Sequence, residues 1–226
     1  MGGGVPKVLR LVAGRPMVSI VVGILRDAGV SPICVVVGSH SADVREALGP
    51  GVLYAVQQEP KGSGDAAAAA ASVLEGLGIE DTIVACGDSP LFSVETVRRL
   101  LDEHRRSGAV VTLTSALLDD PRGYGRIIRN QAGGVAAIVE EAEASEAVRA
   151  TREVNGGLYA FKSKWLWSSL AAADAGPDEF VLTQIVQDAA SSGKHVAAVE
   201  CDPAEVAGVN TPEQLLAAER TLLSRA

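Results

Sequence analysis

Asp88 combines a residue type and a position that suit metal-assisted chemistry on phosphates. It follows Gly87 at the end of an apolar run, residues 82–86. A carboxylate in such a place is a typical Mg²⁺ ligand in phosphoryl-type chemistry, because phosphates and waters complete the octahedron of the metal. The alternative is that Asp88 caps the helix expected at residues 94–106, but Ser93 sits at the better cap position. The pattern therefore favours a metal ligand over a cap.

Two further segments carry groups that suit a phosphorylated ligand. Lys7 precedes an apolar stretch, and its ammonium could be a point charge for phosphate, although an isolated lysine is more often plain surface. Residues 57–66 follow an expected strand and open an alanine-rich helix, whose N-terminus offers free N–H donors. The glycines of this segment permit close approach of a ligand. An ordinary strand-to-helix loop, with Ser63 or Asp65 as the cap, explains the same pattern, so both interpretations stay open.

Polar residues in the middle of the chain suit a hydroxyl-rich ligand. Residues 119–127 place glycines around one tyrosine and a basic residue, so a backbone, a ring face and a fixed charge could all meet a ligand. Glu140 ends an expected strand and could accept from hydroxyls, while Asn155 can donate and accept together. Singly, these are a surface turn and ordinary strand-end residues. Together they favour one wall of a pocket for a polar, phosphorylated ligand.

The elements that must position these residues alternate between helix and strand. Helices are expected at residues 16–28, 41–48, 65–77, 94–106, 164–173, 180–191 and 212–224. Strands are expected at residues 33–37, 52–56, 82–86, 109–116, 126–129, 135–139, 154–161 and 196–199, with a hairpin joining 126–129 to 135–139. Strands separated by helices of this length imply parallel βαβ units with right-handed crossovers.

The predicted fold class is α/β, with a doubly wound, mostly parallel, Rossmann-like sheet and a mixed C-terminal half. We expect one domain over residues 1–226. Ligands in such sheets bind beyond the carboxyl ends of the strands. The segments described above fall at that edge, so we expect them to line one site.

Composition limits the partners of the chain. It is 47% hydrophobic but only 4% aromatic, which indicates a core of aliphatic side chains. The formal charge of −8 argues against nucleic acid or an anionic membrane surface as partner, but a local lysine or a metal ion can still attract phosphate. The 3 cysteines form no Cys-x-x-Cys pair, so neither a disulfide framework nor a zinc site is indicated. Without a bilayer-length apolar stretch or a secretion signal, we expect a soluble, cytoplasmic protein.

Taken in order, these segments resemble the sugar-1-phosphate nucleotidyltransferase family, most closely its uridylyltransferase domain acting on N-acetylglucosamine 1-phosphate. A Gly-Val-Asn triplet at residues 208–210 adds to the resemblance. The resemblance implies catalytic Lys7 and Asp88, with Lys7 on the nucleotide phosphates; Gln57, Gly62 and Ser63 on the uracil base; Asp88 and Asn210 as Mg²⁺ ligands; and Gly125, Glu140 and Asn155 on the sugar. Asn210 could instead cap the last helix, or do both.

The activity implied by the resemblance is transfer of UMP from UTP to an N-acetylhexosamine 1-phosphate, which yields UDP-N-acetylglucosamine, a cell wall precursor, and pyrophosphate. Cys86 replaces a common tyrosine of the family, and Val181 and Gln184 depart from its sugar-side pattern. Two alternatives therefore stay open. One is another nucleotide-sugar pyrophosphorylase, acting on glucose or mannose 1-phosphate; the other is a nucleotide-sugar-binding pseudoenzyme.

The start of the chain is the largest departure from the family. Residue 1 aligns with the end of the family's first strand and Gly-rich loop, which cradles the triphosphate, so we expect an N-terminal truncation relative to the family. We also expect no C-terminal β-helix acetyltransferase domain of the kind found in the bifunctional members, which leaves the oligomeric state open. Because the first strand of a doubly wound sheet is usually central, we expect a slot between the strands at 33–37 and 82–86, or another segment filling it.

Overall fold

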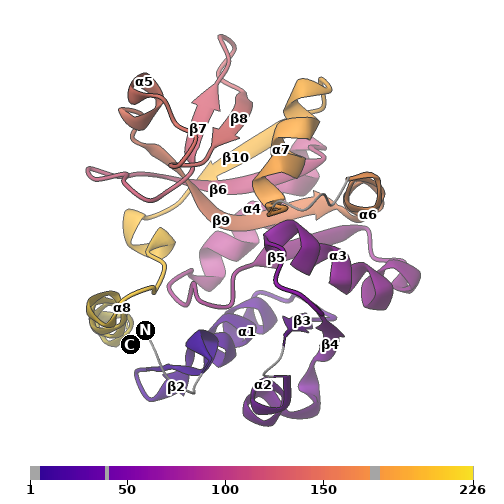
Figure 1. Cartoon of the computed structure of the whole chain (residues 1–226), viewed down its shortest axis with the longest axis vertical. Helices are drawn as coiled ribbons and strands as arrows, with labels where there is room; N and C mark the ends of the chain where they lie inside the picture. The colour runs from indigo at the N-terminus through magenta and orange to yellow at the C-terminus, as the bar shows by residue number, and fades with distance from the viewer. Residues whose placement is uncertain (1–5, 39–40, 174–178, 226) are drawn as a thin grey trace.

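The computed structural model describes residues 6–38, 41–173 and 179–225 (Figure 1). Its helices are α1 (Met17–Asp27), α2 (Ser41–Leu48), α3 (Ser63–Leu74), α4 (Val94–Ser107), α5 (Glu146–Arg149), α6 (Ser163–Ala172), α7 (Leu182–Ser191) and α8 (Pro212–Ser224). Its strands are β1 (Leu11–Val12), β2 (Arg15–Pro16), β3 (Cys34–Val37), β4 (Leu53–Val56), β5 (Asp81–Ala85), β6 (Val111–Leu117), β7 (Arg126–Arg129), β8 (Val135–Val139), β9 (Glu153–Lys162) and β10 (Val196–Glu200). None of these helices combines the length and the apolar character that crossing a bilayer requires.

The larger sheet is built around β9, the long strand that crosses the middle of Figure 1. Its strand order is β10-β6-β9-β7-β8, and β5 also pairs with β9. Because β5 and β6 are both antiparallel to β9, and β10 is parallel to β6, the strands β5, β6 and β10 run in one direction. The antiparallel β9 and the β7–β8 hairpin make the later half mixed, as the sequence predicts.

Both faces of this sheet are covered by helices, which confirms the doubly wound α/β class. Alternate residues of β9 enter different apolar clusters: Tyr159 and Phe161 pack with side chains of α7, whereas Leu158 and Ala160 pack with side chains of α4. This alternation follows from the period of two in a strand, which sends successive side chains to opposite faces. A strand that is apolar on both faces must be buried on both.

The N-terminal half holds a second sheet, in which β3 and β4 pair in parallel. It lies below the larger sheet in Figure 1, with α3 between the two sheets in that view. α3 is rich in alanine, and the small side chains of Ala67 and Ala70 let the helix pack closely against its neighbours. α3 contacts both strands of this small sheet and also α6 and α7 beside the larger sheet, so it joins the two sheets.

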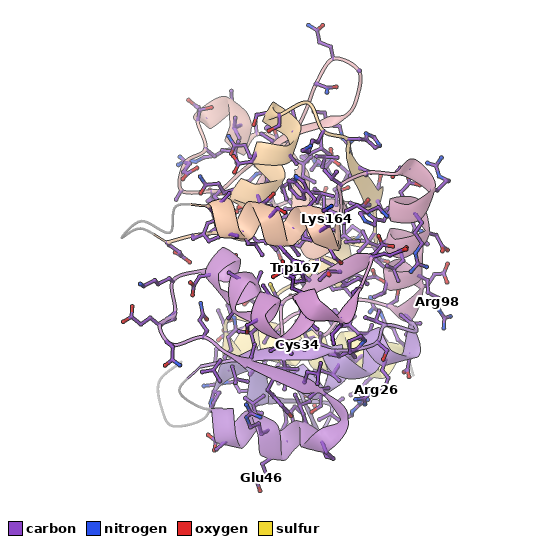
Figure 2. The ribbon with its side chains drawn as sticks, turned by 90° about the vertical axis from the view of Figure 1, so that its right-hand side faces the viewer. Arg26, Cys34, Glu46, Arg98, Lys164 and Trp167 are labelled. Atoms are coloured by element: carbon purple, nitrogen blue, oxygen red, sulfur yellow. The ribbon has the colours of Figure 1, made fainter. Side chains whose placement is uncertain are left out.

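A slot separates β3 from β5, as the sequence predicts. Among the described residues, β3 pairs only with β4, and β5 pairs only with β9. A cavity of about 590 Å³ lies between them, lined by both strands and by apolar side chains of α1 and α3. Cys34 and Trp167, labelled in Figure 2, both line this cavity. Protein interiors contain few voids larger than a water molecule, so an apolar space of this size is unusual within a core.

Candidate active site

Lys7, Asp88 and Asn210 meet in space although they come from three distant parts of the chain. Lys7 opens the short helix η1 (Lys7–Leu9), Asp88 follows β5, and Asn210 precedes α8. The Lys7 ammonium contacts the Asp88 carboxylate as an ion pair and donates a hydrogen bond to the Asn210 side-chain oxygen. The backbone N–H of Val209 also donates to the Asp88 carbonyl at 3.3 Å, which holds the two loops together.

The helix caps near these residues are filled by other side chains. Ser93 caps α4 by accepting from the Thr96 N–H, and Thr211 caps α8 in a capping box with Gln214. The alternative that Asn210 caps the last helix is therefore wrong, and its side-chain oxygen contacts Lys7 instead. Neither Asp88 nor Asn210 has a structural task at a helix end that would explain its position.

The cluster suits a divalent cation with few protein ligands. Asp88 and Asn210 present hard oxygen donors on either side of the Lys7 ammonium, so a positive charge already lies between them. Among the described residues, no group of three or more His, Cys, Asp or Glu side chains could hold a metal by itself. Mg²⁺ does not need such a group, because phosphate oxygens and waters supply its remaining ligands. The residues therefore fit Mg²⁺, provided that Lys7 moves aside toward the phosphates.

The predicted base-binding residues lie in the loop between β4 and α3. The Gln57 side-chain amide donates to the Gly62 carbonyl at 3.2 Å and to the Asp65 carboxylate at 2.7 Å, which closes the loop on itself. A second cavity, of about 370 Å³, opens beside Gln57 and Lys61. Ser63 lines the large cavity between β3 and β5, which also reaches Asp88. Ser63 and Asp88 thus border one cavity, whereas Gln57 borders the second.

Gly62 and Ser63 have structural tasks that the sequence does not reveal. A Cβ atom on Gly62 would lie 2.3 Å from the Phe180 carbonyl oxygen, and its φ of +105° is in the region that favours glycine. The Ser63 hydroxyl accepts from the Leu182 N–H at 2.9 Å, so it satisfies the first turn of α7. The interpretation of Ser63 as the cap of its own helix is wrong: α3 begins at Ser63, and its cap residue is Gly62.

The predicted sugar-side residues also come together. The Asn155 N–H donates to the Gly125 carbonyl at 2.8 Å, and a Cβ on Gly125 would lie 3.2 Å from a Glu140 side-chain oxygen. Glu140 accepts from the Thr183 hydroxyl at 2.8 Å, and the Asn155 side-chain amide donates to the Tyr159 hydroxyl at 2.5 Å. Each polar group of this wall is therefore oriented by a second side chain.

Tyr159 connects the sugar-side wall to the Asp88 loop. Burial raises the pKa of its hydroxyl, a hydrogen bond from Asn155 opposes this, and the nearby Cys86 and Glu140 add to the rise. Cys86 directly precedes Gly87 and Asp88, so the wall and the Asp88 loop adjoin. Sequence reasoning missed Tyr159; its spacing of four residues from Asn155 on one strand, which places both on the same face, is the signal that could have found it.

The fold and the site together define an α/β protein whose candidate phosphate-binding residues, Lys7, Asp88 and Asn210, meet beyond the end of β5. The chain belongs to the family of MobA-like NTP transferase domains, whose model matches residues 1–200. The resemblance to nucleotidyltransferases that the sequence motifs predict is thereby confirmed.

Full-length relatives support the same family. The chain is 40% identical over 223 residues to the bifunctional protein GlmU of Heliobacterium modesticaldum, and 42% identical over 226 residues to that of Brevibacillus brevis. Each match covers 97% of this chain and 48% of the relative, so the chain spans about half the length of the curated relatives it matches. A candidate glucose-1-phosphate thymidylyltransferase from Bacillus anthracis, solved with sucrose, has the same fold, with a TM-score of 0.76 at 20% identity over 95% of this chain and 85% of that one.

Proposed function

We propose that this chain transfers UMP from UTP to an N-acetylhexosamine 1-phosphate, with N-acetylglucosamine 1-phosphate as the preferred acceptor, and releases pyrophosphate. The observation that carries the proposal is the convergence of Lys7, Asp88 and Asn210 beside a wall formed by Gly125, Glu140 and Asn155. The identity of about 40% to proteins named GlmU supports the choice of nucleotide and sugar. The cytoplasmic location stays a prediction.

The chemistry needs positioning and charge neutralisation and no covalent intermediate. A phosphate oxygen of the sugar phosphate attacks the α-phosphorus of UTP in line, and the bond from that phosphorus to the bridging oxygen breaks, so that pyrophosphate leaves. Lys7 would stabilise the charge that builds on the phosphate oxygens. Asp88 and Asn210 would hold Mg²⁺, which neutralises phosphate charge when bound.

The two substrates would be held on different sides of the Lys7 cluster. Gln57, Gly62 and Ser63 would contact the base, and the backbone of the 57–66 loop can come close to a planar ring because its glycines lack side chains. Glu140 and Asn155 would bind the sugar hydroxyls and the acetamido group through oxygens and an amide whose directions are set by Thr183 and Tyr159.

A second candidate is a pyrophosphorylase for glucose 1-phosphate. The fold neighbour is a candidate thymidylyltransferase for that sugar, and Cys86 stands where the family commonly has tyrosine. A smaller side chain at the junction of the sugar wall and the Asp88 loop would alter the shape of the acceptor pocket.

A substrate matrix separates these candidates. The purified chain is incubated with Mg²⁺ and each pair of UTP, dTTP, GTP or ATP with N-acetylglucosamine, glucose or mannose 1-phosphate, and pyrophosphate release is measured. Highest kcat/KM with UTP and N-acetylglucosamine 1-phosphate supports the proposal, and highest values with another pair reassign the substrate. Binding of the nucleotide sugar by calorimetry without turnover of any pair would indicate a pseudoenzyme. Asp88→Asn is the inactive control.

A further inference from the structure

Arg126 is a fully buried charged residue next to Gly125 in the predicted sugar-side wall. The residue has 0% relative exposure, and its backbone lies between Val139 of β8 and Val154 of β9. Burying a guanidinium away from water is costly unless a partner compensates its charge. Arg126 directly follows Gly125, so whatever holds its guanidinium also constrains that glycine.

Glu141 is the partner that compensates this charge. The Arg126 Nη2 donates to the Glu141 Oε2 at 2.6 Å, and the Arg126 Nη1 donates to the Tyr124 carbonyl. The Nε atom of Arg126 is buried without a hydrogen-bond partner among the described residues, so the neutralisation depends on Glu141. Hydrogen bonds from Arg126 and from a backbone N–H, together with the charge of Arg126, hold the pKa of the Glu141 carboxyl below its ordinary value, although desolvation opposes them.

The same ion pair fixes the loop that precedes β7. The Gly123 N–H donates to the Glu141 carboxylate at 3.2 Å, and Tyr124 is held through its carbonyl by Arg126. Gly123 and Tyr124, the two residues before Gly125, are therefore tied to one carboxylate–guanidinium pair. Gly125 in turn accepts the hydrogen bond from the Asn155 N–H.

Tyr124 carries this constraint across to the other side of the site. Its half-buried ring packs against the apolar cluster that includes Val206, and its hydroxyl lies close to the backbone of Gly208. Gly208 begins the triplet that ends at Asn210, and Val209 of that triplet is bonded to the Asp88 backbone. A continuous set of contacts thus runs from Glu141 through Arg126 and Tyr124 to the Gly208 loop.

We infer that Arg126, Glu141 and Tyr124 form a strut that positions the sugar-side wall relative to the loop bearing Asn210. The expected effect of the strut on catalysis rests on the proposed function, whereas the existence of the strut does not. These residues are positioning residues, because they act through Gly125 and Gly208. Loss of the strut should make the two halves of the site move independently and misalign the acceptor phosphate with the metal-binding groups.

Amide hydrogen exchange tests the strut without requiring turnover. Glu141→Gln keeps the size of the side chain but removes the charge that Arg126 needs, and Tyr124→Phe removes only the hydroxyl. We expect at least fivefold faster exchange at residues 123–125 and 208–210 in Glu141→Gln, and at 208–210 alone in Tyr124→Phe. Exchange at both loops equal to the parent in both variants would overturn the inference.

Matched controls exist for both variants. Asp120→Asn makes the same chemical change in the exposed Arg122–Asp120 pair of the same loop. Tyr54→Phe removes a hydroxyl that also bonds to a backbone group, the Gly49 carbonyl at 3.0 Å. Both controls should leave exchange at the two loops unchanged, whereas equal acceleration in a control and its test variant would contradict the strut.

The catalytic consequence has a separate readout. In Tyr124→Phe, kcat for nucleotidyl transfer should fall about tenfold while KM for UTP stays within twofold of the parent, and Tyr54→Phe should change neither. Faster exchange with unchanged kcat would overturn the positioning role. Should the parent chain show no nucleotidyl transfer at all, the proposed function fails, while the exchange result still decides whether the strut exists.

Discussion

The backbone N–H of Asn155 donates to the carbonyl of Gly125 at 2.8 Å, which joins β9 to the start of the β7–β8 hairpin. The Asn155 side chain is held separately: its amide donates to the Tyr159 hydroxyl at 2.5 Å, and its oxygen accepts from the Gly157 N–H at 3.2 Å. A side chain oriented by a second residue is well suited to recognise a ligand, since less of its rotamer freedom is lost on binding.

Asn155→Ala should weaken use of the sugar phosphate much more than use of the nucleotide. We expect KM for N-acetylglucosamine 1-phosphate to rise at least tenfold, because the variant cannot make the hydrogen bonds of the amide, while KM for UTP stays within twofold. Steady-state kinetics with each substrate varied in turn measures both. Ser168→Ala, which changes an exposed hydroxyl on α6, serves as the control. Equal loss for both substrates, or none, would remove Asn155 from the sugar side.

Substitutions at the neighbouring residues Asn210 and Thr211 should have different effects, because Asn210 belongs to the candidate site and Thr211 caps α8. Asn210→Ala should lower kcat at least tenfold and raise the Mg²⁺ concentration needed for half-maximal rate, with little change in melting temperature. Thr211→Ala should lower the stability by about 1 kcal/mol through loss of the cap of α8, with a smaller effect on the rate. Thermal unfolding and Mg²⁺ titrations measure the two effects. The assignment of Asn210 fails if the two variants behave alike.

Gly62→Ala should be among the most damaging small substitutions in the loop between β4 and α3. The new Cβ would lie 2.3 Å from the Phe180 carbonyl, and the φ of +105° is strained for alanine. We expect a loss of about 3 kcal/mol, or roughly 6–12 °C in melting temperature. Gly76→Ala, where the added Cβ would meet nothing within 4 Å, is the control and should change stability little. A melting temperature within 2 °C of the parent would show that Phe180 can move aside.

The slot between β3 and β5 predicts the effect of adding a strand. An extension ahead of residue 1, made of an apolar strand and a Gly-rich loop, should raise both the melting temperature and the nucleotidyl transfer rate. Its backbone groups can pair with the free edges of β3 and β5, each unpaired buried group costing about 1–3 kcal/mol. The same extension with prolines at alternate strand positions is the control. A melting temperature and a transfer rate that the extension leaves at the values of residues 1–226 alone would contradict this prediction.

His104 should make stability fall as the pH drops below neutrality. It is fully buried, and its Nδ1 atom shares a hydrogen bond of 2.9 Å with the Thr112 hydroxyl. Its Nε2 atom lies 3.5 Å from the Asp81 carboxylate, which also pairs with Lys162 and Arg105. Burial lowers its pKa, with Asp81 opposing and Lys162 and Arg105 adding to the decrease. Because the pKa of His104 is lower in the native state, the unfolded chain takes up the proton first as the pH falls below about 6.5. This proton uptake favours the unfolded state, so the free energy of unfolding decreases toward lower pH.

Urea unfolding at pH 7.5 and 5.5 measures this dependence. The parent should lose more stability between the two values than His104→Gln, which keeps hydrogen-bonding groups but does not titrate. His195→Gln, at an exposed position, should behave as the parent does. An identical pH dependence in the parent and His104→Gln would show that another group is responsible.

Local pattern was sufficient for elements whose boundaries depend on near neighbours. The hairpin strands at 126–129 and 135–139 and the helix at 212–224 have the predicted bounds, because alternation, turn glycines and a Pro after a Thr cap are all readable in sequence. The start of α3 was predicted two residues late. Its first turn is fixed by Phe180, which lies more than a hundred residues away in the chain.

The same distinction applies to the site. Lys7 and Asp88 could be expected to share one site, because strand ends of a doubly wound sheet share one edge, whereas Asn210 was expected there only from the resemblance to the family. The burial of Arg126 could not be predicted, since a basic residue between glycine and isoleucine is ordinarily exposed, and only the fold places Glu141 beside it. The roles of the individual site residues in catalysis and binding stay predictions.

The cysteines give the slot a chemical reporter. Cys34 and Cys86 both line the cavity between β3 and β5, whereas Cys201 is buried elsewhere in the core. The rate at which a thiol-alkylating reagent modifies each residue therefore measures how open this space is, peptide by peptide in a mass spectrum. A strand or ligand that occupies the space would shield the first two thiols together and leave the third as an internal standard.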